Sequence, residues 1–188
     1  TTWLEKASNV NPEAMSPALN LGMHYLRINQ PQKTLTLARK LQPANPANPA
    51  LLELLGQAQM ATKDTAGALD TYGKLVALMP KSALAQMRLA GVYKAMNNET
   101  SAASHLRRAV DLQPNFIPAR LAQIEAAIRA GRGEEALQIA RDVQKLDPKA
   151  AVGYMLEGDV LLAQRKPALA AQAFEKAQSL GASPDVFA

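Results

Sequence analysis

The side chains that most often perform catalysis are few in this 188-residue sequence, and they do not cluster. There is no cysteine, and the two histidines, His24 and His105, lie far apart and have no second histidine four residues away for metal binding. Phosphate-binding P-loop and HExxH motifs are missing. The adjacent Glu134 and Glu135 fall in the first turn of a predicted helix, where they complement the helix dipole. We therefore expect neither an enzyme nor a metal or cofactor site.

The prolines show how the chain is organised. Five of the 12 prolines lie at intervals of 34 residues, namely Pro12, Pro46, Pro80, Pro114 and Pro148. A fixed period of this length indicates a repeat architecture. Because proline lacks an amide hydrogen and has a fixed φ, each of these residues is predicted to end one unit and turn the chain.

Two further columns with the same period hold mostly small residues. They are Gly22, Gly56, Ala90, Ile124 and Gly158, and Thr34, Ala68, Ala102, Ala136 and Ala170. Small side chains at fixed positions let two helices cross closely, and apolar residues three and four positions apart predict one buried face on each helix. Each unit is therefore predicted to contain two helices. We expect the first helices at 14–28, 49–61, 83–95, 117–130 and 151–164, and the second at 32–42, 66–78, 100–112, 134–146 and 167–179.

The order of residues within a unit resembles the tetratricopeptide repeat. The unit that ends at Pro80 carries the resemblance most clearly, with Gly56, then Ala68, then Tyr72 four residues later. The resemblance implies an all-α fold, a right-handed α-α superhelix of antiparallel helix pairs that forms a tetratricopeptide solenoid. We expect about five full repeats of 34 residues plus partial ends.

The period also predicts the domain organisation, a single array over residues 1–188. Its repeats are predicted at 13–46, 47–80, 81–114, 115–148 and 149–184. Residues 1–12 would be the second helix of a truncated repeat, and residues 185–188 would start a further one. Because solenoids normally end in capping elements with a polar outer face, these ends predict a fragment of a longer array.

In this repeat family the first helix of each pair lines a concave groove that contacts ligands. The resemblance therefore implies a non-catalytic scaffold that binds a protein or peptide. The predicted groove residues are Leu19, Met23, Arg27, Glu53, Gln57, Met60, Met87, Lys94, Leu121, Glu125, Ile128, Arg129, Met155 and Asp159. Methionine is common on adaptable binding surfaces, although it also fills gaps between helices. Mixed charges among apolar residues favour an extended or helical peptide.

The charge distribution bears on the alternatives to peptide binding. The net charge of +5 arises in the first half, because residues 1–94 carry 10 basic and 5 acidic side chains and residues 95–188 carry 11 of each. A surface for nucleic acid would need a basic stripe with aromatic residues for stacking, and the few aromatic residues fall mostly in predicted core columns. Nucleic acid is therefore disfavoured as a partner. A helical-repeat RNA-binding module and a self-association module remain the alternatives.

A narrower resemblance is to the bacterial PEP-CTERM-system TPR-repeat lipoproteins. It is carried by residues 153–159, Gly-Tyr-Met-Leu-Glu-Gly-Asp, by Leu-Leu-Ala-Gln at 161–164 and by Asn-Phe-Ile-Pro-Ala at 115–119. It implies a periplasmic or membrane-anchored protein of the Gram-negative envelope, held by a lipid anchor outside this segment and linked to exosortase and exopolysaccharide export. No apolar run approaches the ~20 residues that span a bilayer, and the sequence itself defines no localisation.

Overall fold

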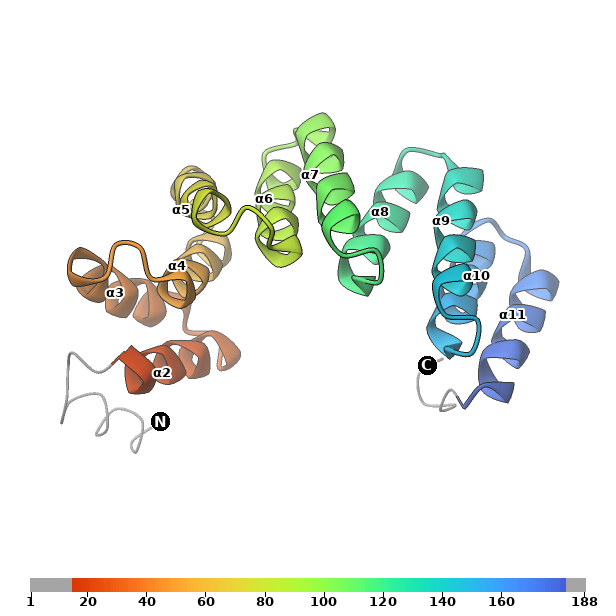
Figure 1. The fold of residues 1–188 in the computed structure, drawn as a ribbon, viewed down its shortest axis with the longest axis horizontal. Coiled ribbons are helices and arrows are strands. Elements are labelled where there is room, and N and C mark those ends of the chain that lie inside the picture. The colour runs from red at the N-terminus through yellow and green to blue at the C-terminus, as the bar shows by residue number, and fades with distance from the viewer. Residues whose placement is uncertain (1–14, 182–188) are drawn as a thin grey trace. The chain divides into compact units, whose positions relative to one another are not determined.

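The computed structural model describes residues 15–181, which form ten α-helices and one short 3-10 helix but no strand. Consecutive helices are joined by short connections, the longest of which contains the 3-10 helix between α3 and α4 (Figure 1). The helices are α2 (Met15–Arg27), α3 (Pro31–Leu41), α4 (Pro49–Ala61), α5 (Thr65–Leu78), α6 (Ala83–Ala95), α7 (Glu99–Leu112), α8 (Ile117–Arg129), α9 (Gly133–Leu146), α10 (Ala151–Ala163) and α11 (Pro167–Ser179), and the 3-10 helix is η1 (Gln42–Ala44). These bounds agree with the predicted helices to within one residue.

The turn inside each helix pair has the same backbone geometry every time. The residue two positions after each first helix has a positive φ, between 56° and 70°, and these residues are Asn29, Lys63, Asn97, Gly131 and Arg165. At the first turn the Gln30 amide donates to the Tyr25 carbonyl at 2.8 Å, and the Asn29 amide donates to the Leu26 carbonyl at 3.1 Å. This is the Schellman arrangement, which ends a helix while satisfying its last carbonyl groups.

Prolines lie at the starts of some helices and, as the period predicts, after the ends of others. Pro31 and Pro167 are the first residues of α3 and α11. Their missing amide hydrogens cost nothing at this position, and their fixed φ suits the first helical turn. Pro80 and Pro114 each stand two residues after the end of a second helix, where a proline prevents the helix from continuing.

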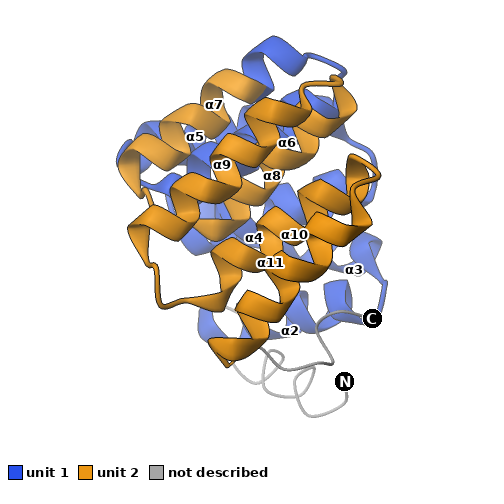
Figure 2. Ribbon diagram, turned by 90° about the vertical axis from the view of Figure 1, so that its right-hand side faces the viewer, with its two compact units in different colours: residues 1–102 blue, residues 103–188 orange. Residues whose placement is uncertain are grey.

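The contacts divide the chain into two compact units, residues 1–102 and 103–188, coloured separately in Figure 2. Within the first unit, the helices from α2 to α6 each pack on the next helix along the chain. Within the second unit, α8 packs on α9, α9 on α10 and α10 on α11. Packing between sequence neighbours is what a solenoid requires, so the predicted all-α repeat class is confirmed.

The core of the first unit depends on small residues where helices cross. Thr34 and Ala68 have no exposed surface. The Tyr72 ring lies against Gly56, where an added Cβ would come within 3 Å of three ring atoms. Thr34 Oγ1 donates to the carbonyl of Gly22 at 2.9 Å, so its buried hydroxyl is satisfied. Glycine at position 56 therefore leaves room for the tyrosine ring.

The second unit contains the same crossing once as in the first unit and once with the sizes of the two facing residues exchanged. In α10, Gly158 faces the Phe174 ring of α11, as Gly56 faces Tyr72. One repeat earlier, Ile124 stands in the glycine column and Ala140 stands in the aromatic column, and both are buried in one cluster. The large side chain has moved to the opposite helix. This exchange explains why Ile124 can depart from the repeat pattern while its helix pair stays packed.

Two parts of the predicted array lie outside the described residues. They are the helix expected at 1–12 and the further repeat expected to start at 185–188. The repeat boundaries and the single array therefore stay predictions.

Candidate functional site: the inner-helix face

The predicted binding residues all lie on the first helices of the pairs, α2, α4, α6, α8 and α10. In the first unit α2 contacts α4 directly, and in the second unit α8 contacts α10. The corresponding second helices, α3 with α5 and α9 with α11, contact each other less. Within each unit, α2 with α4 and α8 with α10 therefore lie closer together than the second helices of the same repeats. We call the fourteen residues predicted above the inner-helix face.

In the first unit this face combines exposed and half-buried side chains. The Met23 side chain is 62% exposed, and Arg27 and Lys94 are also exposed. Leu19 and Met60 are half-buried and pack against the core clusters beneath them. Met23 is therefore exposed to solvent, whereas Met60 helps to fill the space between helices.

The charged residues of the first unit form a network that links two first helices. Arg88 Nε of α6 donates to Glu53 Oε1 of α4 at 2.6 Å, and Gln57 Nε2 donates to the same oxygen at 2.5 Å. Glu53 Oε2 is buried and accepts no hydrogen bond in the described structure. Sequence reasoning did not select Arg88, because it follows Glu53 by 35 residues and so lies one position off the repeat column.

The same network acts on a buried tyrosine. Burial raises the pKa of Tyr72, the nearby Glu53 carboxylate raises it further, and Arg88 opposes the increase. Tyr72 is therefore a neutral phenol at physiological pH. The Glu53–Arg88 pair thus lies close to the crossing that holds α4 on α5.

In the second unit the inner-helix face carries two carboxylates one repeat apart, Glu125 of α8 and Asp159 of α10. Glu125 Oε2 lies 3.9 Å from Arg129 Nη1, one helical turn away. Partial desolvation raises the pKa of the Asp159 carboxyl group, although the residue remains exposed. Leu121 is 41% exposed, whereas Ile128 packs on the core of this unit. Leu121 is therefore the better placed of these two apolar residues for contact with a ligand.

Titratable groups outside this face are dispersed. His24 Nδ1 lies 3.3 Å from Arg27 Nη2, and burial together with Arg108 lowers the pKa of His105. Within residues 15–181 there is no group of three or more His, Asp or Glu residues that could hold a metal ion. In the same range no helix is both long and apolar enough to cross a membrane. Within each unit, the inner-helix face combines apolar side chains with charges of both signs.

The helix pairs and their inner-helix face define a protein of the helical-repeat class. The family model of the tetratricopeptide repeat matches residues 19–83, 53–116 and 121–186. The chain belongs to the tetratricopeptide-repeat family. A search of curated proteins found no match.

Solved structures show the same fold. TTC0263, a thermophilic TPR protein of Thermus thermophilus, superposes with a TM-score of 0.68 at 21% identity, covering 89% of this chain and 92% of that one. MamA 41-end from Desulfovibrio magneticus RS-1 gives 0.65 at 21% identity, with 92% and 99% covered. YrrB, described as a TPR protein with an unusual peptide-binding site, gives 0.59 at 20% identity, with 95% and 92% covered. At these identities the similarity establishes the fold alone.

Proposed function

We propose that this protein is a non-catalytic scaffold that binds a protein or peptide on its inner-helix face. The observation that carries the proposal is that the first helices of each unit combine an exposed apolar side chain with charged groups. In the first unit these are Met23 and the Glu53–Arg88 pair, and in the second unit they are Leu121 and the carboxylate of Asp159. Apolar side chains supply most of the binding energy of such a face, and charges select the register of the ligand. Peptide binding by YrrB, as its description states, supports the same kind of ligand here.

Peptide display provides the test, because the natural ligand need not be known in advance. Peptides selected on the 188-residue chain are titrated against Met87→Glu and Met155→Glu, each of which places a charge in the apolar part of the face. We expect each variant to weaken binding about tenfold or more, because an apolar contact is lost and a carboxylate must be desolvated. Fluorescence anisotropy measures the dissociation constants.

Met79→Glu is the matched control, because Met79 is an exposed methionine at the end of α5 and lies outside the inner-helix face. It should leave the affinity unchanged, and all three variants should keep the helix content of the parent by circular dichroism. Equal binding by parent, Met87→Glu and Met155→Glu would show that the ligand uses another surface. Tight and steeply salt-dependent binding of single-stranded RNA would favour the RNA-binding alternative instead.

The narrower resemblance to the PEP-CTERM-system lipoproteins supports a more specific version of this proposal. In that version the scaffold works in the bacterial envelope and serves exosortase-linked sorting or exopolysaccharide export. The reading frame that encodes this segment tests it directly, since a signal sequence followed by a lipidated cysteine should precede the array. A reading frame that encodes neither would contradict the envelope assignment and leave peptide binding unaffected.

A further inference from the structure

A pair of hollows recurs at the repeat spacing within the second unit. One has a volume of about 230 Å³ and lies between α7, α8 and α9, and the other has a volume of about 320 Å³ and lies between α9, α10 and α11. Arg107 in the first hollow corresponds to Arg141 in the second, 34 residues later. Because the two sites are built from equivalent positions, each serves as an internal comparison for the other.

Both hollows lie away from the inner-helix face. On α8 the first hollow is lined by Arg120, Gln123 and Ala126. The inner-helix face uses Leu121, Glu125, Ile128 and Arg129 of the same helix. At about 100° per residue these two sets point to opposite sides of α8. A ligand in the hollow is therefore independent of a peptide on the inner-helix face.

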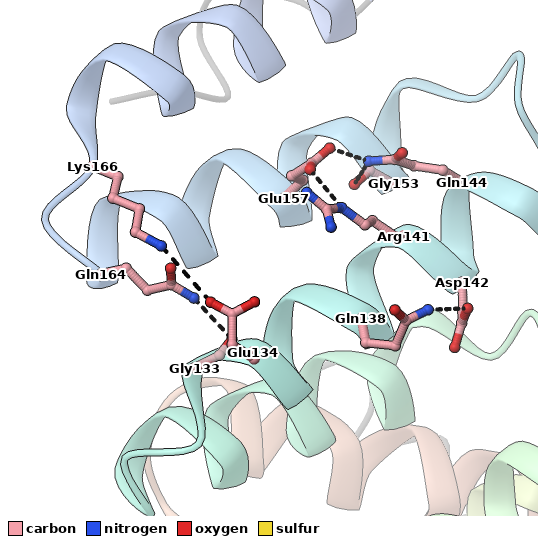
Figure 3. A network of polar contacts seen from close by, with 10 residues as sticks. All are labelled: Gly133, Glu134, Gln138, Arg141, Asp142, Gln144, Gly153, Glu157, Gln164 and Lys166. Atoms are coloured by element: carbon pink, nitrogen blue, oxygen red, sulfur yellow. Dashed lines mark hydrogen bonds and ion pairs between the residues drawn. The ribbon is translucent and has the colours of Figure 1, made fainter.

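In the hollow between α9 and α11 the arginine is neutralised. Arg141 Nε donates to Glu157 Oε1 at 3.1 Å, and Gln144 Nε2 donates to Glu157 Oε2 at 2.6 Å (Figure 3). The Glu157 side chain is only 16% exposed, so its carboxylate is held largely inside the protein. This site already contains its own anion.

In the hollow between α7, α8 and α9 no carboxylate stands at the position that corresponds to Glu157. Gln123 replaces the glutamate, since it stands 34 residues before Glu157. Within the described residues Arg107 forms no hydrogen bond or ion pair. Gln123 Oε1 is buried in the wall of this hollow and accepts no hydrogen bond. One substitution in the repeat thus leaves the exposed Arg107 without an internal carboxylate and the buried Gln123 Oε1 without a donor.

Two more arginines reinforce the positive charge of this hollow. Arg120 stands where the second hollow has Tyr154, and its Nε donates to the carbonyl of Pro114 at 3.2 Å. Arg120 also interacts electrostatically with the Asp142 carboxylate, whose Oδ1 forms an ion pair with Lys145 Nζ at 3.0 Å.

Arg132, which also lines the hollow, is paired with Glu135, with 2.9 Å between Nη1 and Oε2. The residues that line the hollow therefore include three arginines and one carboxylate.

We propose that the hollow between α7, α8 and α9 binds a small organic oxyanion, a carboxylate or phosphate group carried on an apolar body. Arginine guanidinium groups bind both kinds of oxyanion through paired, charge-assisted hydrogen bonds. Leu106 and Ile139 add apolar lining that suits the body of the ligand. A volume of about 230 Å³ admits a fragment-sized molecule rather than a folded partner.

Titration of the 188-residue chain with phenyl phosphate and with benzoate at low salt tests the proposal, with binding followed by NMR chemical shifts. We expect saturable binding of at least one probe, with shifts centred on α7, α8 and α9. Arg107→Ala should weaken binding about tenfold or more, because a charge-assisted contact is lost. Arg141→Ala is the matched control. It should leave the affinity unchanged, because Arg141 already forms an ion pair with Glu157.

Gln123→Glu is the second variant, because it recreates in this hollow the internal carboxylate of the neighbouring one. We expect it to abolish probe binding while keeping the melting temperature of the parent. Stronger binding of phenyl phosphate would identify phosphate as the preferred group, and stronger binding of benzoate would identify carboxylate. The proposal is overturned if neither probe binds, if neutral benzyl alcohol binds equally well, or if the Arg107→Ala and Arg141→Ala variants lose affinity equally.

Discussion

At the scale of single residues, one backbone position with a positive φ recurs in the turn of every helix pair. All five turns need the left-handed conformation, yet only one of them has glycine, at Gly131. The others use Asn, Lys or Arg, for which this conformation costs of order 1 kcal/mol. The five hydrogen-bonded helix ends outweigh that cost, since each satisfies carbonyl groups that would otherwise lack donors.

Gly131→Ala measures the free-energy cost of a positive φ separately from any steric clash. An added Cβ at Gly131 would have no atom within 4 Å, so a steric clash does not contribute. We expect the variant to lower the free energy of unfolding by about 1 kcal/mol, because alanine disfavours a φ of +70°. Urea denaturation measures this change, and Gly73→Ala, at another open helical position without positive φ, is the control. Equal effects at the two sites would contradict the backbone explanation.

At the scale of elements, the packing of a helix pair depends on the combined volume of two side chains that face each other where the helices cross. Gly56 with Tyr72 and Gly158 with Phe174 place the large residue on the second helix, whereas Ile124 with Ala140 places it on the first. The column pattern of the sequence shows Ile124 as an exception. Only the three-dimensional pairing shows that Ala140 compensates for it.

A double-substitution experiment tests this compensation. Ala140→Phe alone should destabilise the protein by about 1–3 kcal/mol, because the ring has no space beside Ile124. Adding Ile124→Gly should recover most of that loss, because it restores the arrangement seen at Gly158 and Phe174. Thermal or urea unfolding of both single variants and the double variant gives the coupling energy. Purely additive losses would show that the two residues do not share one crossing.

At the scale of the whole molecule, stability comes from contacts between neighbouring helices. Each unit has its own contacts from helix to helix, and no described sheet links distant parts of the sequence. In such an architecture the effect of a substitution is largest in its own repeat and decreases along the array. The two compact units should therefore respond differently to a defect placed in only one of them.

Ala136→Leu provides that defect, because Ala136 is fully buried at the crossing of α8 and α9. We expect a loss of about 1–3 kcal/mol from overpacking. Hydrogen exchange measured by mass spectrometry should show faster exchange in α8–α10 than in the parent, with α2–α5 nearly unchanged. An unchanged melting temperature would contradict the repeat frame, and uniform acceleration over all helices would contradict local coupling.

Much of the fold could be predicted because its determinants are periodic. The 34-residue spacing of Pro46, Pro80 and Pro114 and the small residues Ala68 and Ala136 specify helix ends and crossings from local chemistry alone. The candidate site was less accessible to this reasoning. The partner of Glu53 lies off the repeat column, and exposure separates Met23 from Met60 although both belong to the same predicted surface.

The sequence by itself determined the helix-pair unit, its period and its family, because helix propensity, proline positions and small-residue columns act over one repeat. The tertiary structure decided which side chains meet across repeats. It paired Arg88 with Glu53 and Arg141 with Glu157, and it left Arg107 beside Gln123 without an internal carboxylate. These pairings depend on distances between helices, which the spacing of residues in the sequence does not specify. They distinguish a hollow whose arginine is paired with an internal carboxylate from one whose arginine is not.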